Sequence, residues 1–216
     1  METRALIFDF DGTLAELNID FAAMKAEVQD LARRMGLAGP WPSEGYLLEQ
    51  VEWAAEALGN GFAEKALALI TNRELASARL GRLFPFTPGL LARARALGLG
   101  LAIVSRNCGA AIRLVFPEVD SACDLFLPRE AAPRPKPDPS HLAAALDGLG
   151  VSPAQAAVVG DHPIDVTTAR TAGCLAVGVA SGRVGPEDLA RAGAGLVLAD
   201  ARGLLEALGL APGPRE

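Results

Sequence analysis

The sequence predicts a doubly wound α/β core with an all-helical block inserted after its first strand. Beyond residue 85, short apolar runs alternate with helical segments, which is the pattern of a parallel sheet covered by helices on both faces. Residues 16–84 show helical periodicity instead, so we expect three or more helices and no strand there. The expected domains are therefore a core of residues 1–15 and 85–216 and an inserted block of residues 16–84.

The first strand is expected at residues 4–9, where the apolar run RALIFD ends in a carboxylate and the polar DGT stops it. Breaks in the inserted block are predicted at 36–42 and 59–61, where glycine and proline gather. The block carries apolar residues at intervals of three and four, the spacing of one helix face: Phe21, Met24, Val28 and Leu31.

The rest of the core alternates regularly between helices and strands. Further strands are expected at 101–105, 155–160, 175–180 and 195–198. Helices are expected near 88–97, 109–116, 139–148, 164–172 and 201–208. Ligands of such folds bind outside the carboxyl ends of the strands, where the winding reverses. Three expected strands end there in polar residues: Asp9, Ser105 and Asp161.

Composition excludes several classes of protein. Half of the 216 residues are hydrophobic and about a fifth are charged, as in ordinary globular proteins. A net charge of −6 without a dense Lys/Arg cluster argues against a nucleic-acid partner. No signal-peptide pattern and no apolar run of membrane-spanning length is found, so we predict a cytoplasmic protein without a membrane partner. Cys108, Cys123 and Cys174 fit neither a disulfide framework nor a zinc site and are expected to be reduced, packed thiols.

Aspartates are crowded at the predicted strand ends. Asp9 and Asp11 lie two residues apart, so their side chains can point to the same side while Phe10 turns into the core. Each like-charged pair at roughly 4 Å would repel by about 4 kcal/mol at an effective dielectric constant of about 20. A bound cation resolves this repulsion, and oxygen ligands beside a phosphate favour Mg²⁺. The candidate metal ligands are Asp9, Asp11, Asp161 and Asp165.

Two further segments carry polar groups suited to an anion. Ser105 is followed by Arg106, Asn107 and then Gly109 at an expected helix start. A serine or asparagine there commonly caps the helix, and the same groups form a phosphate cradle, so the two roles are compatible. Lys136 lies in PRPKPDP, where the prolines fix the backbone. A fixed ammonium beside carboxylates and a phosphate would offset charge and hold a nucleophile.

Each motif also has a purely structural interpretation. DFDGT is typical of a turn after a strand, and GDxxxD at 160–165 is typical of a helix N-cap. Most lysines are simply solvated. A calcium loop is disfavoured because it needs glycine at its sixth position, whereas Gly12 comes fourth. The four motifs in this order along one chain are better explained as parts of one site.

These motifs resemble those of a known family. DFDGT at 9–13, Ser105 after an apolar strand, Lys136 before a proline and GDxxxD at 160–165 resemble the four motifs of the haloacid dehalogenase superfamily of phosphohydrolases. The helical insertion resembles the cap of the phosphoglycolate phosphatase and β-phosphoglucomutase branch. The resemblance covers nearly the whole chain. It implies a Rossmann-like core whose helical cap closes over a Mg²⁺-dependent phosphatase site, with an aspartyl-phosphate intermediate.

The resemblance implies a role for each acidic residue. Asp9 would be the nucleophile, and Asp11 would protonate the leaving alkoxide and then deprotonate the attacking water. Asp161 would complete the Mg²⁺ coordination, supported by Asp165. The second carboxylate, Asp11, argues against a dehalogenase, which differs at that position.

The resemblance also implies how a substrate phosphate is bound. Lys136 would bridge the phosphoryl group to Asp9. Arg106-Asn107 stands where many relatives carry Asn-Lys, which is a mild departure from the pattern. The candidate phosphate-binding residues are Ser105, Arg106, Asn107 and Gly12.

Several alternatives stay open from the sequence. A phosphomutase would carry the same motifs and differ in not releasing inorganic phosphate. A catalytically silent binding module and a phospho-accepting signalling domain are disfavoured, the first by the retention of all four motifs and the second by the long insertion. The expected partner is a small phosphorylated metabolite, and the chain is expected to be a monomer or a homodimer.

Some residues receive no assignment from the sequence. His162 lies inside GDxxxD and is interpreted as a bystander or a site-lining residue, whereas His141 is expected on a helix surface. No specificity role is given to the basic residues of the inserted block: Lys25, Arg33, Arg34 and Arg73.

Overall fold

The computed structural model describes residues 2–132 and 134–210. The chain divides into two compact units, of which the first comprises Met1–Leu17 and Gly81–Glu216 and the second comprises Asn18–Leu80. Among the described residues, no helix has both the length and the apolar character needed to cross a membrane.

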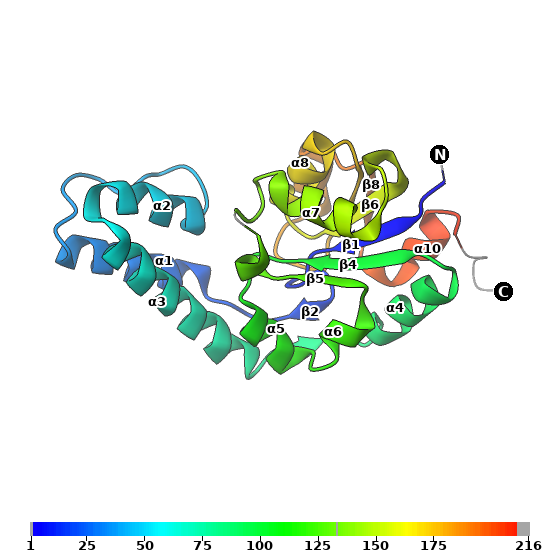
Figure 1. Cartoon of the computed structure of the whole chain (residues 1–216), viewed down its shortest axis with the longest axis horizontal. Helices are drawn as coiled ribbons and strands as arrows, with labels where there is room; N and C mark the ends of the chain where they lie inside the picture. The colour runs from blue at the N-terminus through cyan, green and yellow to red at the C-terminus, as the bar shows by residue number, and fades with distance from the viewer. Residues whose placement is uncertain (1, 133, 211–216) are drawn as a thin grey trace. The chain divides into compact units, whose positions relative to one another are not determined.

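A six-stranded sheet in the order β5-β4-β1-β6-β7-β8 forms the centre of the first unit (Figure 1). All neighbouring strands run parallel, which confirms the predicted doubly wound fold. The chain winds from β1 outward through β4 to β5 and returns to β6 on the other side of β1, so the winding reverses beside β1. The strands are β1 (Ala5–Phe8), β4 (Gly100–Val104), β5 (Leu125–Leu127), β6 (Ala156–Gly160), β7 (Leu175–Val179) and β8 (Leu196–Leu198).

Helices cover both faces of this sheet. Figure 1 shows α7 and α8 on one side of it and α4 and α6 on the other. The helices of the first unit are α4 (Thr87–Ala96), α5 (Gly109–Val115), α6 (Val119–Ala122), α7 (Ser140–Leu149), α8 (Pro163–Thr171), α9 (Pro186–Arg191) and α10 (Leu204–Ala207). Three short 3₁₀ turns are η1 (Arg129–Ala131), η2 (Pro153–Gln155) and η3 (Ala201–Gly203).

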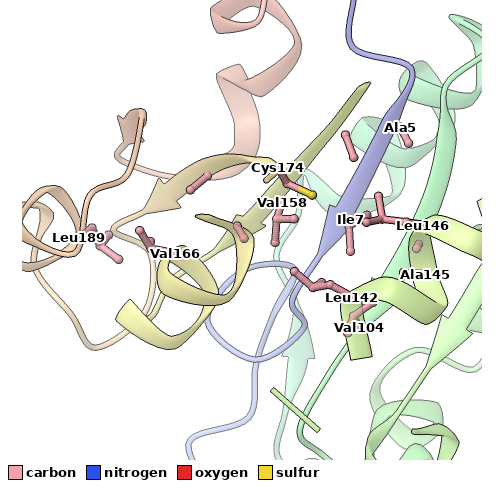
Figure 2. Close-up of a cluster of buried hydrophobic side chains, with 14 residues drawn as sticks. Ala5, Ile7, Val104, Leu142, Ala145, Leu146, Val158, Val166, Cys174 and Leu189 are labelled. Atoms are coloured by element: carbon pink, nitrogen blue, oxygen red, sulfur yellow. The ribbon is translucent and has the colours of Figure 1, made fainter. Parts of the chain in front are cut away.

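The continuous apolar runs are explained by burial on both faces of the sheet. Ala5 and Ile7 of β1 lie in a hydrophobic cluster (Figure 2), and Leu6 and Phe8, which point to the opposite face, are buried as well. The cluster includes residues of α7, α8 and α9, among them Leu142, Ala145, Leu146, Val166 and Leu189. The three cysteines are buried, as predicted for packed thiols.

Three short strands differ from the sequence prediction. β5, which lies between Asp124 and Pro128, was missed because three residues are too few to show a period. The expectation of no strand within residues 16–84 is wrong at its two ends, where β2 (Ala15–Glu16) and β3 (Arg82–Leu83) pair antiparallel. A two-residue ladder leaves no alternation in the sequence, since its pairing partners are far apart along the chain.

The second unit consists of α1 (Phe21–Arg34), α2 (Leu47–Leu58) and α3 (Asn60–Ala78), in agreement with the predicted helical block. Asp20 caps α1 by accepting a hydrogen bond from the Ala23 amide. Gly59, with a positive φ of 81°, separates α2 from α3 as expected. Phe21 is 46% exposed and therefore lies off the buried face of α1. The described buried apolar residues of the unit are Ile19, Met24, Val28, Ala32, Val51, Ala54, Phe62, Ala66, Ile70 and Ala78.

Candidate active site

The first motif forms a tight turn at the carboxyl end of β1. The Asp9 amide donates to the Val159 carbonyl at 2.8 Å, which extends the pairing of β1 with β6 by one residue. Phe10 is fully buried, as predicted, and its carbonyl accepts the Ala15 amide at 3.1 Å. Gly12 adopts a φ of 83°, a backbone conformation that favours glycine, and this lets the chain fold back.

Register brings the other motifs to the same edge of the sheet. Phe8 of β1 pairs with Ile103 of β4 on one side and with Val159 of β6 on the other. The carboxyl ends of the three central strands therefore lie side by side. Each of these strands is followed within two positions by one of the predicted polar residues: Asp9, Ser105 and Asp161.

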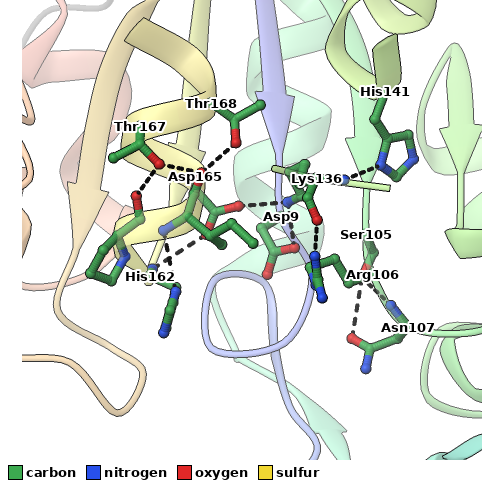
Figure 3. A network of polar contacts seen from close by, with 12 residues as sticks. Asp9, Ser105, Arg106, Asn107, Lys136, His141, His162, Asp165, Thr167 and Thr168 are labelled. Atoms are coloured by element: carbon green, nitrogen blue, oxygen red, sulfur yellow. Dashed lines mark hydrogen bonds and ion pairs between the residues drawn. The ribbon is translucent and has the colours of Figure 1, made fainter. Parts of the chain in front are cut away.

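Three carboxylates gather at this edge, and Figure 3 shows two of them, Asp9 and Asp165, beside the buried Lys136. Asp9, Asp161 and Asp165 each place one oxygen within 4.8 Å of the others. The Lys136 Nζ lies 2.8 Å from Asp9 Oδ1 and 2.6 Å from Asp165 Oδ1. Lys136 is 1% exposed, so this ammonium belongs to the interior of the site and is not one of the solvated majority.

The charges in this cluster do not cancel. Burial raises the pKa of Asp9 to about 7 even though the Lys136 ammonium opposes the rise. Burial, with the charges of Asp9 and Asp165, raises the pKa of Asp161 to about 8. Burial alone would lower the pKa of Lys136, but the Asp165 and Asp9 carboxylates raise it above its ordinary value. One ammonium therefore faces three carboxylates. An all-oxygen donor set with an excess of negative charge suits a hard divalent cation, and Mg²⁺ itself stays a prediction.

We expect Mg²⁺ to bind more tightly as the pH rises from about 6 to about 8. The ordinary carboxyl pKa is 3.8, whereas Asp9 and Asp161 titrate at about 7 and about 8 in the folded protein. At pH values between the ordinary pKa and the raised pKa, the metal-free folded protein holds protons that the unfolded chain has lost. The free energy of unfolding of the metal-free protein therefore falls as the pH rises. Mg²⁺ must displace those protons, which changes its affinity by up to about tenfold per pH unit for each proton.

The measurement is the Mg²⁺ concentration dependence of the melting temperature at three pH values. Asp161→Asn serves as the comparison, because it removes one carboxylate of the cluster and should weaken the response at every pH. An affinity for Mg²⁺ that is the same at about pH 6 and about pH 8 would contradict the coupling.

Glycines create the space that the carboxylates occupy. A Cβ atom on Gly12 or on Gly182 would collide with the Asp161 carboxylate, and one on Gly160 would collide with Asp165. The Ser181 hydroxyl donates to the Gly12 carbonyl at 2.7 Å and ties the loop after β7 to the first turn. The sequence interpretation missed Ser181 and Gly182, although their position after an expected strand was a signal.

The predicted contact of Gly12 with a phosphate stays a prediction, and the structure shows how its backbone is held. Its amide donates to the Ala15 carbonyl at 2.7 Å, so its one backbone donor is already used within the turn. Gly12 also has a steric and conformational role, because it lies against the Asp161 carboxylate and adopts a positive φ.

Gly12→Ala is expected to lower the free energy of unfolding more than the same substitution at a glycine with a similar φ and no close neighbour. It is also expected to weaken Mg²⁺ binding at least about tenfold. The matched control is Gly45→Ala, because Gly45 has a φ of 82° against 83° for Gly12 and no atom lies within 4 Å of the place that its new methyl group would take. The control should lose about 1–2 kcal/mol of unfolding free energy through backbone strain alone. Urea unfolding and Mg²⁺ titration of both variants provide the measurement, and equal losses would show that crowding of Asp161 is unimportant.

The segment after β4 folds into a compact loop. Ser105 is fully buried, and its Oγ accepts the Asn107 amide at 3.2 Å and lies 3.2 Å from Asn107 Oδ1. Arg106 donates from its guanidinium to the Lys136 carbonyl. The structure therefore joins this loop to the lysine segment, while contacts of Ser105, Arg106 and Asn107 with a phosphate stay predictions.

The predicted cradle at the amino end of α5 is partly occupied. The Gly109 amide donates to Glu130 Oε2 at 3.1 Å, so a carboxylate already satisfies the first amide of the helix. Arg129, which is 8% exposed, donates to the Arg106 carbonyl at 3.2 Å. Arg129 and Glu130 were not singled out in the sequence, because both belong to the segment after the missed strand β5.

Asp11 is placed differently from the other aspartates. Its Oδ1 accepts the Leu17 amide at 2.8 Å. Among the described residues, the carboxylate cluster consists of Asp9, Asp161 and Asp165 and does not include the Asp11 side chain. The roles of the Asp11 carboxylate in proton transfer and in metal ligation both stay predictions.

The two histidines have distinct positions. The expectation that His141 lies on a helix surface is wrong, since it is fully buried and its Nδ1 accepts the Lys136 amide at 3.2 Å. His162 caps α8, with its Nδ1 accepting the Ile164 amide at 3.2 Å. Asp165 Oδ2 in turn accepts the His162 amide at 3.3 Å. Asp165 therefore completes the N-terminal cap of α8 and also binds Lys136 through its other carboxylate oxygen.

The reversal point is lined with three carboxylates, of which two are buried, and with a buried lysine. These features place the chain among the α/β enzymes that bind ligands at the carboxyl edge of a parallel sheet. Residues 3–173 match the family model of the haloacid dehalogenase-like hydrolases. The chain belongs to this family and is a hydrolase, as the motif resemblance implied.

Curated relatives and solved structures agree with this membership. The chain is 30% identical to a phosphoglycolate phosphatase of Cupriavidus necator, with 88% of this chain and 86% of that protein covered. It is 31% identical to a phosphoserine phosphatase of Thermus thermophilus, with 86% of this chain and 91% of that protein covered. The fold is similar to that of a hydrolase from Pseudomonas syringae, at a TM-score of 0.75, 21% identity and coverage of 97% and 98%.

Proposed function

We propose that the protein is a Mg²⁺-dependent phosphatase that hydrolyses a small phosphate monoester through a phosphorylated Asp9. The observation that carries the proposal is the contact of the Lys136 ammonium with Asp9 inside the carboxylate cluster. This contact would keep the Asp9 carboxylate, whose side chain is 13% exposed, oriented at the reversal point beside the groups that would neutralise a phosphoryl transition state. Relatives named as phosphatases support the same reaction.

The first half of the reaction is transfer to Asp9. A carboxylate oxygen of Asp9 forms a bond to phosphorus while the bond to the leaving oxygen breaks, and Asp11 gives that oxygen a proton. Lys136 and Ser105 stabilise the charge on the equatorial oxygens. The metal ion, when held by Asp9, Asp161 and Asp165, supplies further charge neutralisation.

The second half is hydrolysis of the acyl phosphate. Asp11, now deprotonated, takes a proton from water as the water oxygen forms a bond to phosphorus. The bond between phosphorus and Asp9 breaks, inorganic phosphate leaves and the Asp9 carboxylate is restored. Release of inorganic phosphate distinguishes this reaction from that of a phosphomutase.

We further propose a small acid monophosphate or sugar monophosphate as substrate. The two relatives named above act, by their names, on phosphoglycolate and phosphoserine, which are both small acid monophosphates. The role of the helical unit, residues 18–80, as a cap stays a prediction. The cytoplasmic location and the monomeric or homodimeric state stay predictions as well.

The test is release of inorganic phosphate from an aryl phosphate and from a panel of phosphoglycolate, phosphoserine, sugar phosphates and nucleotides. Activity is expected with Mg²⁺, loss in EDTA and recovery on adding Mg²⁺ back, because the carboxylate cluster needs a cation. Full turnover in EDTA would contradict the proposed metal dependence. Activity on nucleotides alone would overturn the proposed substrate class.

A further inference from the structure

We infer that the buried His141 is a positioning residue, which holds the Lys136 segment in register with the ends of β4 and β5. The inference rests on the proposed function for its kinetic test only, since the contacts themselves are independent of the reaction. It gives a role to a side chain that the mechanism above does not use.

The contacts form a continuous hydrogen-bonded path. The Lys136 amide donates to His141 Nδ1 at 3.2 Å, and His141 Nε2 lies 3.1 Å from the Leu127 carbonyl oxygen. The same carbonyl accepts the Ser105 amide at 3.0 Å. A carbonyl oxygen has two lone pairs, so Leu127 can serve both donors at once. One backbone oxygen at the end of β5 thus links the lysine segment to the predicted phosphate loop.

Arg106 binds the backbone of Lys136 at its carbonyl group. Its guanidinium donates to the Lys136 carbonyl, and it follows Ser105 directly in the chain. Both backbone polar groups of Lys136 are therefore bound, the amide by His141 and the carbonyl by Arg106. With its backbone held at one end, the lysine side chain reaches Asp9 at the other, so a displaced backbone would move the ammonium away from the reacting carboxylate.

The partners of the imidazole determine its protonation. A backbone amide can only donate, so Nδ1 must carry a lone pair toward Lys136. A carbonyl can only accept, so Nε2 must carry the hydrogen toward Leu127. Burial, together with the positive charge of Lys136, lowers the pKa of His141 to about 4, which agrees with a neutral ring at neutral pH. Only the neutral ring with its proton on Nε2 can make both bonds.

Simple core packing would not need these polar partners. An apolar side chain of similar size would fill the same space, yet it would leave the Lys136 amide without its acceptor. The two explanations therefore differ in what a volume-conserving substitution does to catalysis.

The kinetic test compares His141→Phe, His141→Asn and a control on the same helix. His141→Phe removes both bonds and should lower kcat about 10–100-fold, with a smaller change in KM, because Lys136 acts in the transition state. His141→Asn keeps an acceptor near the Nδ1 position and should recover part of the loss. Leu146→Ala, a buried core change on α7, should lower the melting temperature while leaving kcat within about twofold.

Three outcomes would overturn the inference. These are a wild-type kcat in His141→Phe, a His141→Asn that is no better than His141→Phe, and a Leu146→Ala that loses kcat as severely. If the wild-type protein releases no phosphate from any ester, the proposed function fails, and the inference is then decided by spectroscopy alone.

The spectroscopic test uses the unmodified protein and needs no activity. The chain has 2 histidines, so long-range ¹H–¹⁵N spectra with His162→Gln for assignment give a clear result. At about pH 7 we expect His141 to show a bare Nδ1 and a protonated Nε2. A proton on Nδ1 would contradict the path through Leu127 and overturn the inference even if the variants failed to fold.

Discussion

Asp9→Asn is expected to abolish phosphoryl transfer, with kcat falling by about 10⁴-fold or more. An amide does not attack phosphorus usefully, and it deprives the Lys136 ammonium of one of its two carboxylate partners. No phosphoenzyme should form, so intact-mass measurement after a rapid acid quench should show no added phosphoryl group. Loss of the fold should not explain the result, because removing one of three crowded carboxylates relieves repulsion in the metal-free protein.

Asp11→Asn is the matched comparison and should behave differently. General acid and base contributions are typically about 10²–10⁴ in rate, so esters with poor leaving groups should slow by that factor. A nitrophenolate needs no proton to leave, so Asp9 should still become phosphorylated, and the acyl phosphate should accumulate because its hydrolysis lacks a base. Phosphorylation of Asp9→Asn, or wild-type turnover of poor leaving groups by Asp11→Asn, would refute this division of labour.

Lys136→Met is expected to lower kcat/KM by about 10²–10³-fold, the usual effect of losing one preorganised donor to a developing charge. Methionine keeps most of the length of the side chain and removes its charge together with its hydrogen-bond donors. The matched control is Lys65→Met on α3, where the lysine is exposed and activity should be unchanged. Equal activities of the two variants would return Lys136 to a structural role.

The same substitution has a consequence for stability. The side chains of Lys136 and Asp165 are 2% and 4% exposed, so removing the ammonium leaves a buried carboxylate without its partner. Breaking a buried pair from one side typically costs about 3–5 kcal/mol. We therefore expect Lys136→Met to melt earlier than wild type in EDTA and to recover part of the difference in Mg²⁺, which thermal unfolding in both conditions would measure.

Most of the fold was predictable because its signals are local. Buried parallel strands leave apolar runs, and the five predicted strands all form, each within two residues of its expected bounds. Strand β5 and the β2–β3 pair were not predictable, since two or three residues carry no period. The order of the strands is likewise absent from any local pattern.

The residues of the candidate site likewise fall into those with local sequence signals and those placed by distant contacts. Asp9, Ser105 and Asp161 were predictable as strand-end residues, and Lys136 stood out through its proline frame and the scarcity of lysine. His141 was placed wrongly on a surface, because its burial depends on β5 and on the Lys136 segment folding over it. Its sequence neighbours suggest only a helix.

The sequence by itself determined the class of fold, the strand ends that carry chemistry and the set of residues that resembles a known family. Tertiary structure alone decided which of these residues touch. Lys136 meets Asp9 across 127 positions of the chain, and Ser181 meets Gly12 across 169. The physical reason is that strand order and register bring such pairs together, and both depend on packing of the whole sheet, whereas the sequence pattern of each segment reports only its own burial and period.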